Sequence, residues 1–342
     1  MTPSEAIQEI ARHGLNNDQE ELIGVLNSYI AEVKEKGRYN FAVALQSLVS
    51  NRKKASSSPL ALHGSEAHLD RVRRNEADEL ILERLKSNYR FENLVSEKSV
   101  SDQLHLFIEE HKKIELLRKY GLPVANKLML YGPSGCGKTL TSYVIAGELE
   151  KEMIVLNLGS IVSSKLGETS KNLAKVFRQA AADSSIIFID EFDSLGKLRD
   201  YSQDHAEMKR VVNTILQLFD YLPQNSLVIA ATNQKNMIDD ALLRRFDLSV
   251  GFSLPGKSQI KELVELTMKK KFTFDNPAQL KKAIDEAEGL SYDSIQKSLI
   301  TAIKKSLFRF SKSEKGRELY PKVAISEWIS LLKQEKSALH QD

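Results

Sequence analysis

At Gly132-Pro133-Ser134-Gly135-Cys136-Gly137-Lys138-Thr139 the chain matches the pattern G-x-x-x-x-G-K-[ST] at each fixed position. An apolar run precedes this loop, and a segment of helical character, Leu140–Glu150, follows it. A strand, a glycine-rich loop and a helix in this order bind phosphate groups through backbone N–H groups and the helix N-terminus. We expect the loop and Leu140 to bind a nucleotide, with Lys138 on the β- and γ-phosphates and the Thr139 hydroxyl on Mg²⁺. The loop therefore predicts a nucleotide-binding α/β fold.

The composition is that of a soluble protein with nearly balanced charge. The 342 residues include 49 Lys and Arg against 46 Asp and Glu, a net charge of +3, which is too small to indicate a dedicated nucleic-acid-binding protein. The single cysteine, Cys136, cannot form an internal disulfide, and this favours a reducing compartment. We find no signal peptide at the N-terminus and no apolar run long enough to span a bilayer, so we expect a cytoplasmic protein.

Four regions are expected along the chain. Residues 1–52 carry helix caps and helical spacing, and indicate a small N-terminal helical domain that binds a partner or substrate, or else a plain helical bundle. Residues 53–87 predict a linker followed by a charged helix from Leu69 to Ser87. Residues 88–256 are expected to form an α/β nucleotide-binding domain, and residues 257–342, helical throughout, a C-terminal lid.

The α/β region alternates short apolar runs with amphipathic helices. This pattern is typical of a parallel sheet covered by helices on both faces. The runs expected to form its strands are Lys127–Tyr131, Met153–Asn157, Ser185–Asp190, Leu227–Thr232 and Leu248–Phe252.

Two acidic residues follow one of these buried strands. The run Ile186–Ile189 ends in Asp190 and Glu191, and the carboxyl ends of strands in an open α/β sheet are where ligands bind. We expect Asp190 to hold Mg²⁺ through its water shell. Glu191 is expected to polarise the water that attacks a phosphate, because phosphoryl transfer requires mainly positioning and charge stabilisation.

Further polar residues follow the next strand. Asn233 comes directly after Leu227–Thr232 and either orients the attacking water or simply forms a turn. Downstream, Arg244 and Arg245 are adjacent, and arginine recognises phosphate through a planar, two-pronged contact. The competing interpretation of this pair is an ordinary surface ion pair. Cys136 also has two interpretations: an accessible thiol whose alkylation blocks nucleotide binding, or a buried thiol that does not react.

Together, these motifs resemble the AAA ATPases, a branch of the AAA+ P-loop ATPases, over residues 89–333. Gly132–Thr139 resembles the Walker A motif, Ile186–Glu191 the Walker B motif and Asn233 the sensor 1 residue. The Leu-Leu-Arg-Arg-Phe stretch that contains Arg244 and Arg245 looks most like that of the meiotic, microtubule-severing members.

The resemblance implies further contacts and partners. It places Gly289 and Ser291 beside the nucleotide and makes Leu94 and Val95 adenine contacts, although the two glycines usual after them are missing here. It implies a ring of identical subunits, which we expect to be a hexamer, with ATP and Mg²⁺ at each subunit interface. The two arginines would then act on the neighbouring subunit's ATP.

One segment departs from the family pattern. Lys165-Leu166-Gly167 corresponds to the pore loop of AAA motors that thread polypeptide, but Lys165 occupies the place of the aromatic residue. An aromatic ring grips many substrate sequences through its apolar face, whereas a flexible ammonium favours an acidic segment. The sequence therefore leaves two functions open. The first is ATP-driven remodelling or translocation of a protein, and the second is an ATP-switched scaffold that controls a partner docked on the N-terminal domain.

Overall fold

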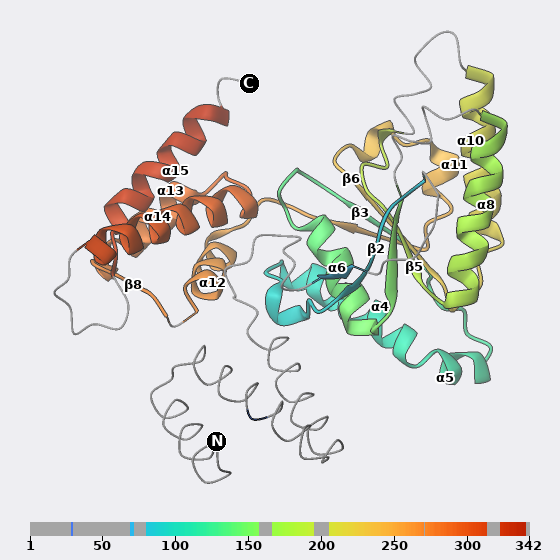
Figure 1. Ribbon diagram of the computed structural model, residues 1–342, viewed down its shortest axis with the longest axis horizontal. Helices are drawn as coiled ribbons and strands as arrows, with labels where there is room; N and C mark the ends of the chain where they lie inside the picture. Colours follow the sequence, from blue (N-terminus) through green and yellow to red (C-terminus); the bar gives the residue numbers. More distant parts are fainter. Residues whose placement is uncertain are drawn as a thin grey trace. The chain divides into compact units, whose positions relative to one another are not determined.

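The computed structural model describes most of the chain from residue 80 onward (Figure 1). The described residues are 29, 69–71, 80–156, 166–194, 205–269, 271–312 and 322–339. Apart from Tyr29, the expected N-terminal domain lies outside them, and so does Lys165. Within the described residues, no helix is both long and apolar enough to cross a membrane.

A seven-stranded sheet forms the centre of the α/β region, in the order β1-β2-β4-β5-β6-β3-β7. The strands are β1 (Leu69–Arg71), β2 (Ile81–Ser87), β3 (Lys127–Tyr131), β4 (Glu152–Leu156), β5 (Ile186–Ile189), β6 (Leu227–Thr232) and β7 (Leu248–Gly251). Neighbours from β4 to β7 are parallel, and these five strands fall on the five apolar runs of the sequence. Because β3 lies between β6 and β7, the phosphate loop leaves the sheet from an interior strand.

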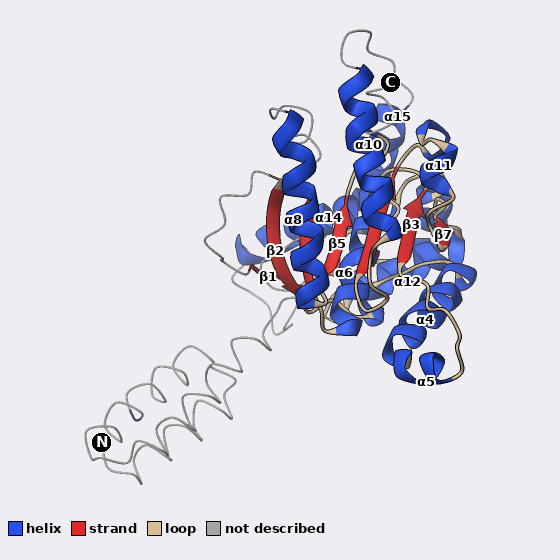
Figure 2. Cartoon of the chain, turned by 90° about the vertical axis from the view of Figure 1, so that its right-hand side faces the viewer, coloured by secondary structure: helices blue, strands red, loops and turns tan. Residues whose placement is uncertain are grey.

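Helices cover both faces of this sheet, as the sequence predicts. In Figures 1 and 2, α8 and α10 lie against one face, and α4 and α6 against the other. The helices of this region are α4 (Lys98–Lys112), α5 (Ile114–Lys119), α6 (Lys138–Leu149), α8 (Leu166–Asp183), α10 (His205–Asp220) and α11 (Asp240–Leu243), with short 3₁₀ helices η1 (Phe91–Asn93) and η2 (Lys235–Met237).

The prediction of a charged helix from Leu69 to Ser87 is wrong. Strands β1 and β2 lie in this segment instead, and β2 pairs antiparallel with β4 while β1 pairs antiparallel with β2. Leu85 is fully buried, and Arg84 forms an ion pair with Glu152 of β4 at 3.4 Å. Without β2, β4 would leave backbone N–H and C=O groups unpaired at that edge, and pairing with them outweighs the helix preference of the Leu, Glu, Arg and Lys residues in β2.

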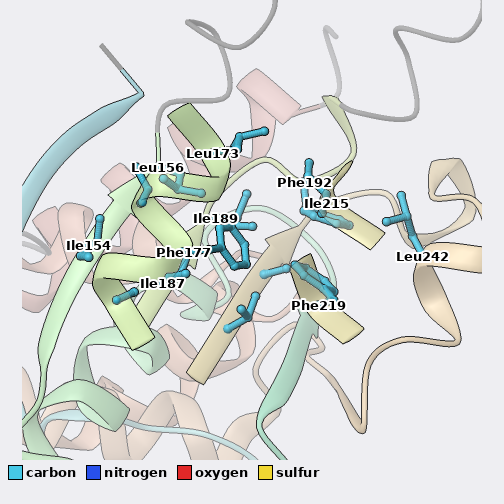
Figure 3. Close-up of a cluster of buried hydrophobic side chains, with 14 of the residues drawn as sticks. Ile154, Leu156, Leu173, Phe177, Ile187, Ile189, Phe192, Ile215, Phe219 and Leu242 are labelled. Carbon is cyan, nitrogen blue, oxygen red and sulfur yellow. The ribbon is translucent and has the colours of Figure 1, made fainter. Parts of the chain in front are cut away.

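The main hydrophobic cluster lies between the sheet and helices α8 and α10 (Figure 3). Ile187 and Ile189 project from β5 toward Phe177 of α8 and Phe219 of α10. All four side chains are at most 3% exposed. This packing fixes the end of β5, from which the expected acidic residues emerge.

The described residues of the lid form four α-helices and a small sheet. The helices are α12 (Lys257–Met268), α13 (Leu280–Ala287), α14 (Tyr292–Lys312) and α15 (Ile325–Leu339), with the 3₁₀ helix η3 (Pro277–Gln279). The expectation that this region is helical throughout is wrong, because β8 (Thr273–Phe274) and β9 (Lys322–Val323) pair in parallel. Strands of two residues are too short to show an alternating pattern in the sequence. The described lid and sheet belong to one compact unit.

Candidate nucleotide site

The phosphate loop requires glycine at two positions for different reasons. Gly132 has φ +142°, and a Cβ there would overlap the carbonyl oxygen of Phe252. Gly135 has φ +70°, and a Cβ there would lie 2.6 Å from the Ser291 hydroxyl of the lid. The loop therefore packs closely against the residue that follows β7 on one side and the lid on the other. With the loop held in these backbone conformations, helix α6 begins directly after it, at Lys138.

The Lys138 side chain lies inside this loop. It is 7% exposed, and its ammonium donates hydrogen bonds to the carbonyl oxygens of Gly132 at 2.8 Å and Pro133 at 2.7 Å. Burial lowers the pKa of Lys138, and the nearby Cys136, Asp190 and Asp193 oppose that shift. The ammonium is thus held between the loop carbonyls and the acidic end of β5, where a phosphate chain would meet it.

Thr139 and Asp190 are in direct contact. The Thr139 hydroxyl donates to Asp190 Oδ2 at 2.9 Å, which joins the start of α6 to the end of β5. Asp190 Oδ1 accepts the backbone N–H of Glu191 at 2.9 Å. Glu191 has φ +51°, a left-handed conformation that is uncommon for a residue other than glycine. Such backbone strain tends to occur at functional sites, and Glu191 is exposed.

The phosphate loop and the end of β5 line one cleft, which has a volume of about 210 Å³. Asn233 lines this cleft as well. A buried hydrogen bond from the Thr232 hydroxyl to Asp193 at 2.9 Å fixes the preceding residue, and the N–H of Gln234 donates to the same hydroxyl at 3.0 Å. These contacts set the turn that carries Asn233. The cleft is lined by Ser134, Gly135, Gly137, Lys138, Thr139, Leu140, Asp190, Glu191, Asn233 and Asp293.

Asp293 is the lining residue that the sequence analysis missed. Its backbone N–H donates to the carbonyl of Gly135 at 3.1 Å, and its side chain pairs with Lys297 at 2.7 Å. Asp293 lies two residues after Ser291, so the resemblance pointed to this helix but not to the acidic side chain. Gly289, with φ +88°, and Ser291 are not among the residues that line the cleft.

The remaining expected nucleotide contacts, Leu94, Val95, Pro133 and Cys136, are not among the residues that line the cleft. Leu94 Cδ1 lies 3.8 Å from the position that a Cβ on Gly137 would take. Val95 is 8% exposed, and Pro133 meets the site through its carbonyl. Cys136 is 2% exposed, and burial raises the pKa of its thiol, so the structure favours an inert thiol.

Arg244 and Arg245 do not line this cleft. They follow α11, and Arg245 forms a two-pronged contact with Asp220, from Nε to Oδ1 at 2.7 Å and from Nη2 to Oδ2 at 3.2 Å. Hydrogen bonding to Asp220 raises the pKa of Arg245 above its usual range. The chain therefore does not supply an arginine to its own cleft from this pair.

The oxygen atoms at the end of β5 suit Mg²⁺. This hard cation takes one or two protein oxygens and completes its shell with phosphate and water, and the Thr139 hydroxyl beside the Asp190 carboxylate offers such a pair. Over the described ranges, no group of three or more His, Cys, Asp or Glu side chains is arranged to hold a metal ion. A site that depends on phosphate oxygens agrees with that finding.

Residues 128–254, which include the phosphate loop, Asp190, Glu191 and both arginines, match the model of the AAA family, "ATPase family associated with various cellular activities". The chain contains an AAA ATPase family domain. Its AAA domain resembles the crystal structure of the FIGL-1 AAA domain with a TM-score of 0.59 and 20% identity, over 75% of this chain and 86% of that one. At this identity, the similarity establishes the fold.

Three curated proteins show what this chain is similar to and over how much of its length. An uncharacterized AAA family ATPase of Sinorhizobium fredii is 35% identical over 62% of this chain and 63% of the relative. The ATP-dependent zinc metalloprotease FtsH of Mesomycoplasma conjunctivae is 31% identical over 61% and 30%, and the cell division cycle protein 48 homolog of Archaeoglobus fulgidus is 37% identical over 46% and 22%. The matches thus span less than two thirds of the length of each relative.

Proposed function

We propose that this AAA protein hydrolyses ATP to ADP and phosphate in the cleft between the phosphate loop and the end of β5. The observation that carries the proposal is the 2.9 Å hydrogen bond from Thr139 to Asp190, which brings the two motifs together in a cleft that Glu191 and Asn233 also line. A loop that binds phosphates, an oxygen pair that suits Mg²⁺ and a carboxylate that can accept a proton are the groups that this reaction needs.

Each side chain has a separate task in this proposal. Lys138 exchanges its loop carbonyls for the β- and γ-phosphate oxygens, and its ammonium stabilises their negative charge. Asn233 orients a water for attack on the γ-phosphorus, and Glu191 accepts the proton as the bond to the β-phosphate oxygen breaks. Thr139 and Asp190 would hold Mg²⁺, which neutralises phosphate charge when bound.

Two substitutions test this proposal. Lys138→Ala should abolish ATP binding, measured with a fluorescent ATP analogue. Glu191→Gln should preserve binding and lower phosphate release by about 10²–10⁴-fold, because it removes the general base. Lys261→Ala and Glu265→Gln, which remove an exposed ion pair on α12, are the matched controls and should retain turnover. Normal turnover in the Glu191→Gln protein would contradict the proposal.

We further propose that the protein acts as a homo-oligomeric ring, a hexamer, that remodels or translocates a protein substrate. In it, the turn that carries Arg244 and Arg245 serves the neighbouring subunit's ATP, and the N-terminal region, residues 1–52, binds the substrate or an effector. Residues 88–256 and 257–342 are the nucleotide domain and its lid. The absence of both arginines from the lining of their own cleft supports an action between subunits.

The alternative is an ATP-switched regulatory scaffold that controls a docked effector without threading. Lys165 favours it, since a lysine takes the place of the aromatic residue in the expected pore loop with Leu166 and Gly167. A substrate that carries an unfoldable fluorescent domain separates the two functions. Loss of fluorescence with ATP, abolished by Leu166→Ala but not by Leu339→Ala at an exposed site on α15, would support threading. Partner activation that survives Leu166→Ala would support the switch.

A further inference from the structure

The turn after α11 is held by the end of α10 at two neighbouring points. Arg245 makes its two-pronged contact with Asp220, the last residue of α10. The next residue, Phe246, is 9% exposed and packs edge-on against Phe219, with ring centroids 5.5 Å apart at 84°. Two consecutive residues of the helix therefore fix two consecutive residues of the turn, one by charge and one by aromatic packing.

Arg244 is in a different situation from its neighbour. Its side chain is exposed, and in the described part of the chain its guanidinium makes no hydrogen bond or ion pair. Its backbone N–H caps α11 by donating to Asp240, and its φ and ψ of −68° and −12° are helical. The N–H of Arg245 donates to the Leu242 carbonyl at 3.1 Å, so the turn continues past Arg244. Successive side chains on a helical turn project about 100° apart, so the two arginine side chains leave this turn in different directions.

The charges of the two arginines also differ in what they offer an external phosphate. The charge of Arg245 is compensated by Asp220, and the guanidinium edge that would face a phosphate already faces a carboxylate. Arg245 would have to give up that contact first, and the freed Asp220 carboxylate would then repel the phosphate. Arg244 can bind phosphate without losing an ion pair to any described residue.

We propose that Arg244 alone acts on the neighbouring subunit's triphosphate, and that Arg245, held by Asp220, is a positioning residue that fixes the turn from which Arg244 projects. This inference rests on the proposed function and divides a task that the sequence assigned to both arginines. Asp220 thereby becomes a residue that affects turnover without touching nucleotide.

Turnover of the full chain at saturating ATP distinguishes the two roles. Arg244→Ala should lower kcat by about 10³-fold, and Arg244→Lys should not restore it, because a lysine lacks the planar fork. Arg245→Ala and Asp220→Ala should each lower kcat by less than about tenfold, and the double variant should be no worse than either, since both remove the same contact. Arg309→Ala, which removes an exposed, paired arginine on α14, is the control and should retain kcat.

A charge exchange makes the test decisive. In the protein with Asp220→Arg and Arg245→Asp, the ion pair is re-formed with its partners reversed, and kcat should recover relative to Asp220→Arg alone. Recovery is expected from a positioning role and not from a residue that contacts phosphate. The proposal is overturned if Arg245→Ala lowers kcat as far as Arg244→Ala while Asp220→Ala retains it, or if the charge exchange fails to rescue a protein with an unchanged Tm.

The same measurements separate this inference from the proposed function. If Glu191→Gln leaves turnover intact, or if the wild-type chain releases no phosphate, the ATPase proposal itself fails. If Glu191→Gln abolishes turnover but Arg244→Ala does not lower it, the ATPase proposal stands and only the division between the two arginines is wrong. Affinity for a fluorescent ATP analogue should stay within about threefold of wild type in the Arg244→Ala, Arg245→Ala and Asp220→Ala proteins, because none of these three residues lines the cleft.

Discussion

Gly147 of α6 packs against the segment that connects β2 to η1. A Cβ at this position would overlap the backbone carbonyl oxygen of Tyr89. Because the overlap is with backbone, no rotation of a side chain can relieve it. Alanine is preferred over glycine in a helix by about 1 kcal/mol, but forcing extra atoms into a packed contact costs about 1–3 kcal/mol or more. The steric cost should therefore outweigh the helix preference for alanine.

We predict that Gly147→Ala lowers the free energy of unfolding by about 2 kcal/mol, measured by urea denaturation. The matched control is Gly256→Ala, where a Cβ would meet only the end of the flexible Gln259 side chain at 3.1 Å. This control should lose less than about 1 kcal/mol, as is usual for a change at a helix N-cap. Equal losses in the two proteins would show that α6 moves away from Tyr89 without difficulty.

His111 makes the stability of the fold depend on pH. Its ring is 7% exposed, Nε2 lies 2.7 Å from the Ala125 carbonyl, and Nδ1 is buried without a partner among the described residues. Burial lowers its pKa from 6.5 to about 4. The unfolded chain binds the proton more readily than the folded chain. The contribution of neutral His111 to the free energy of unfolding is therefore fully present above about pH 6.5 and is lost as the pH falls toward 4.

We predict that the free energy of unfolding falls by as much as about 3 kcal/mol between pH 6.5 and pH 4 on account of His111. The variant His111→Gln retains a hydrogen-bond donor but cannot titrate, so its stability should fall less over the same interval. The control is His105→Gln at an exposed site on the same helix, which makes the same substitution without replacing a buried ring. Urea denaturation at several pH values measures all three, and parallel curves for wild type and His111→Gln would refute the prediction.

At the scale of elements, β2 offers a direct test of strand against helix. Leu82 and Leu85 would share one face of a helix, because residues three apart are neighbours there, but they lie on opposite faces of a strand. In the structure, Leu85 is fully buried and Leu82 is 65% exposed. Their side chains therefore report which conformation the segment adopts.

We predict that Leu85→Ala costs about 2–5 kcal/mol of unfolding free energy, as expected for a buried leucine, and that Leu82→Ala costs less than about 0.5 kcal/mol. Thermal or urea denaturation of the two variants gives the comparison. Similar losses would argue that the segment packs as the helix expected from the sequence.

The difference between β2 and the five parallel strands shows what sequence patterns can and cannot predict. The strand β5 is an uninterrupted apolar run because both of its faces are buried, and a short run of this kind between helical segments is typical of a parallel strand. Strand β2 is charged and lies near an edge, and its conformation depends on the open edge of β4, far along the chain. The two-residue strands β8 and β9 likewise exist only through their pairing with each other.

The residues of the site likewise fall into those that a local motif predicts and those that depend on contacts between distant segments. Lys138, Thr139, Asp190 and Glu191 could be predicted because their positions follow from local motifs, and the structure places all four in one cleft. Asp293 could not, because it reaches the cleft through the packing of the lid on Gly135. The contact between Arg245 and Asp220 joins two segments 25 residues apart, and no motif indicates it.

At the scale of the whole molecule, the proposed ring makes turnover a property of the assembly. If the arginine of one subunit completes the site of the next, specific activity should fall on dilution below the concentration that supports assembly, whereas a self-sufficient subunit would keep it constant. We expect phosphate release per chain to fall together with the mass of the oligomer, measured by light scattering over the same dilution series.

Mixing two inactive chains tests the same arrangement without dilution. The Glu191→Gln chain keeps its arginines, and the Arg244→Ala chain keeps its glutamate, so an intact site forms wherever an Arg244→Ala subunit is served by a Glu191→Gln neighbour. Random mixing of equal amounts gives such a pairing at about one interface in four, and a corresponding fraction of wild-type phosphate release is expected. A chain with both substitutions is the control, because its mixture with either single variant lacks one of the two groups in every subunit and should stay inactive. If activity per chain is instead constant on dilution and Arg244→Ala chains hydrolyse ATP normally, each subunit completes its own site and the ring is not part of the chemistry.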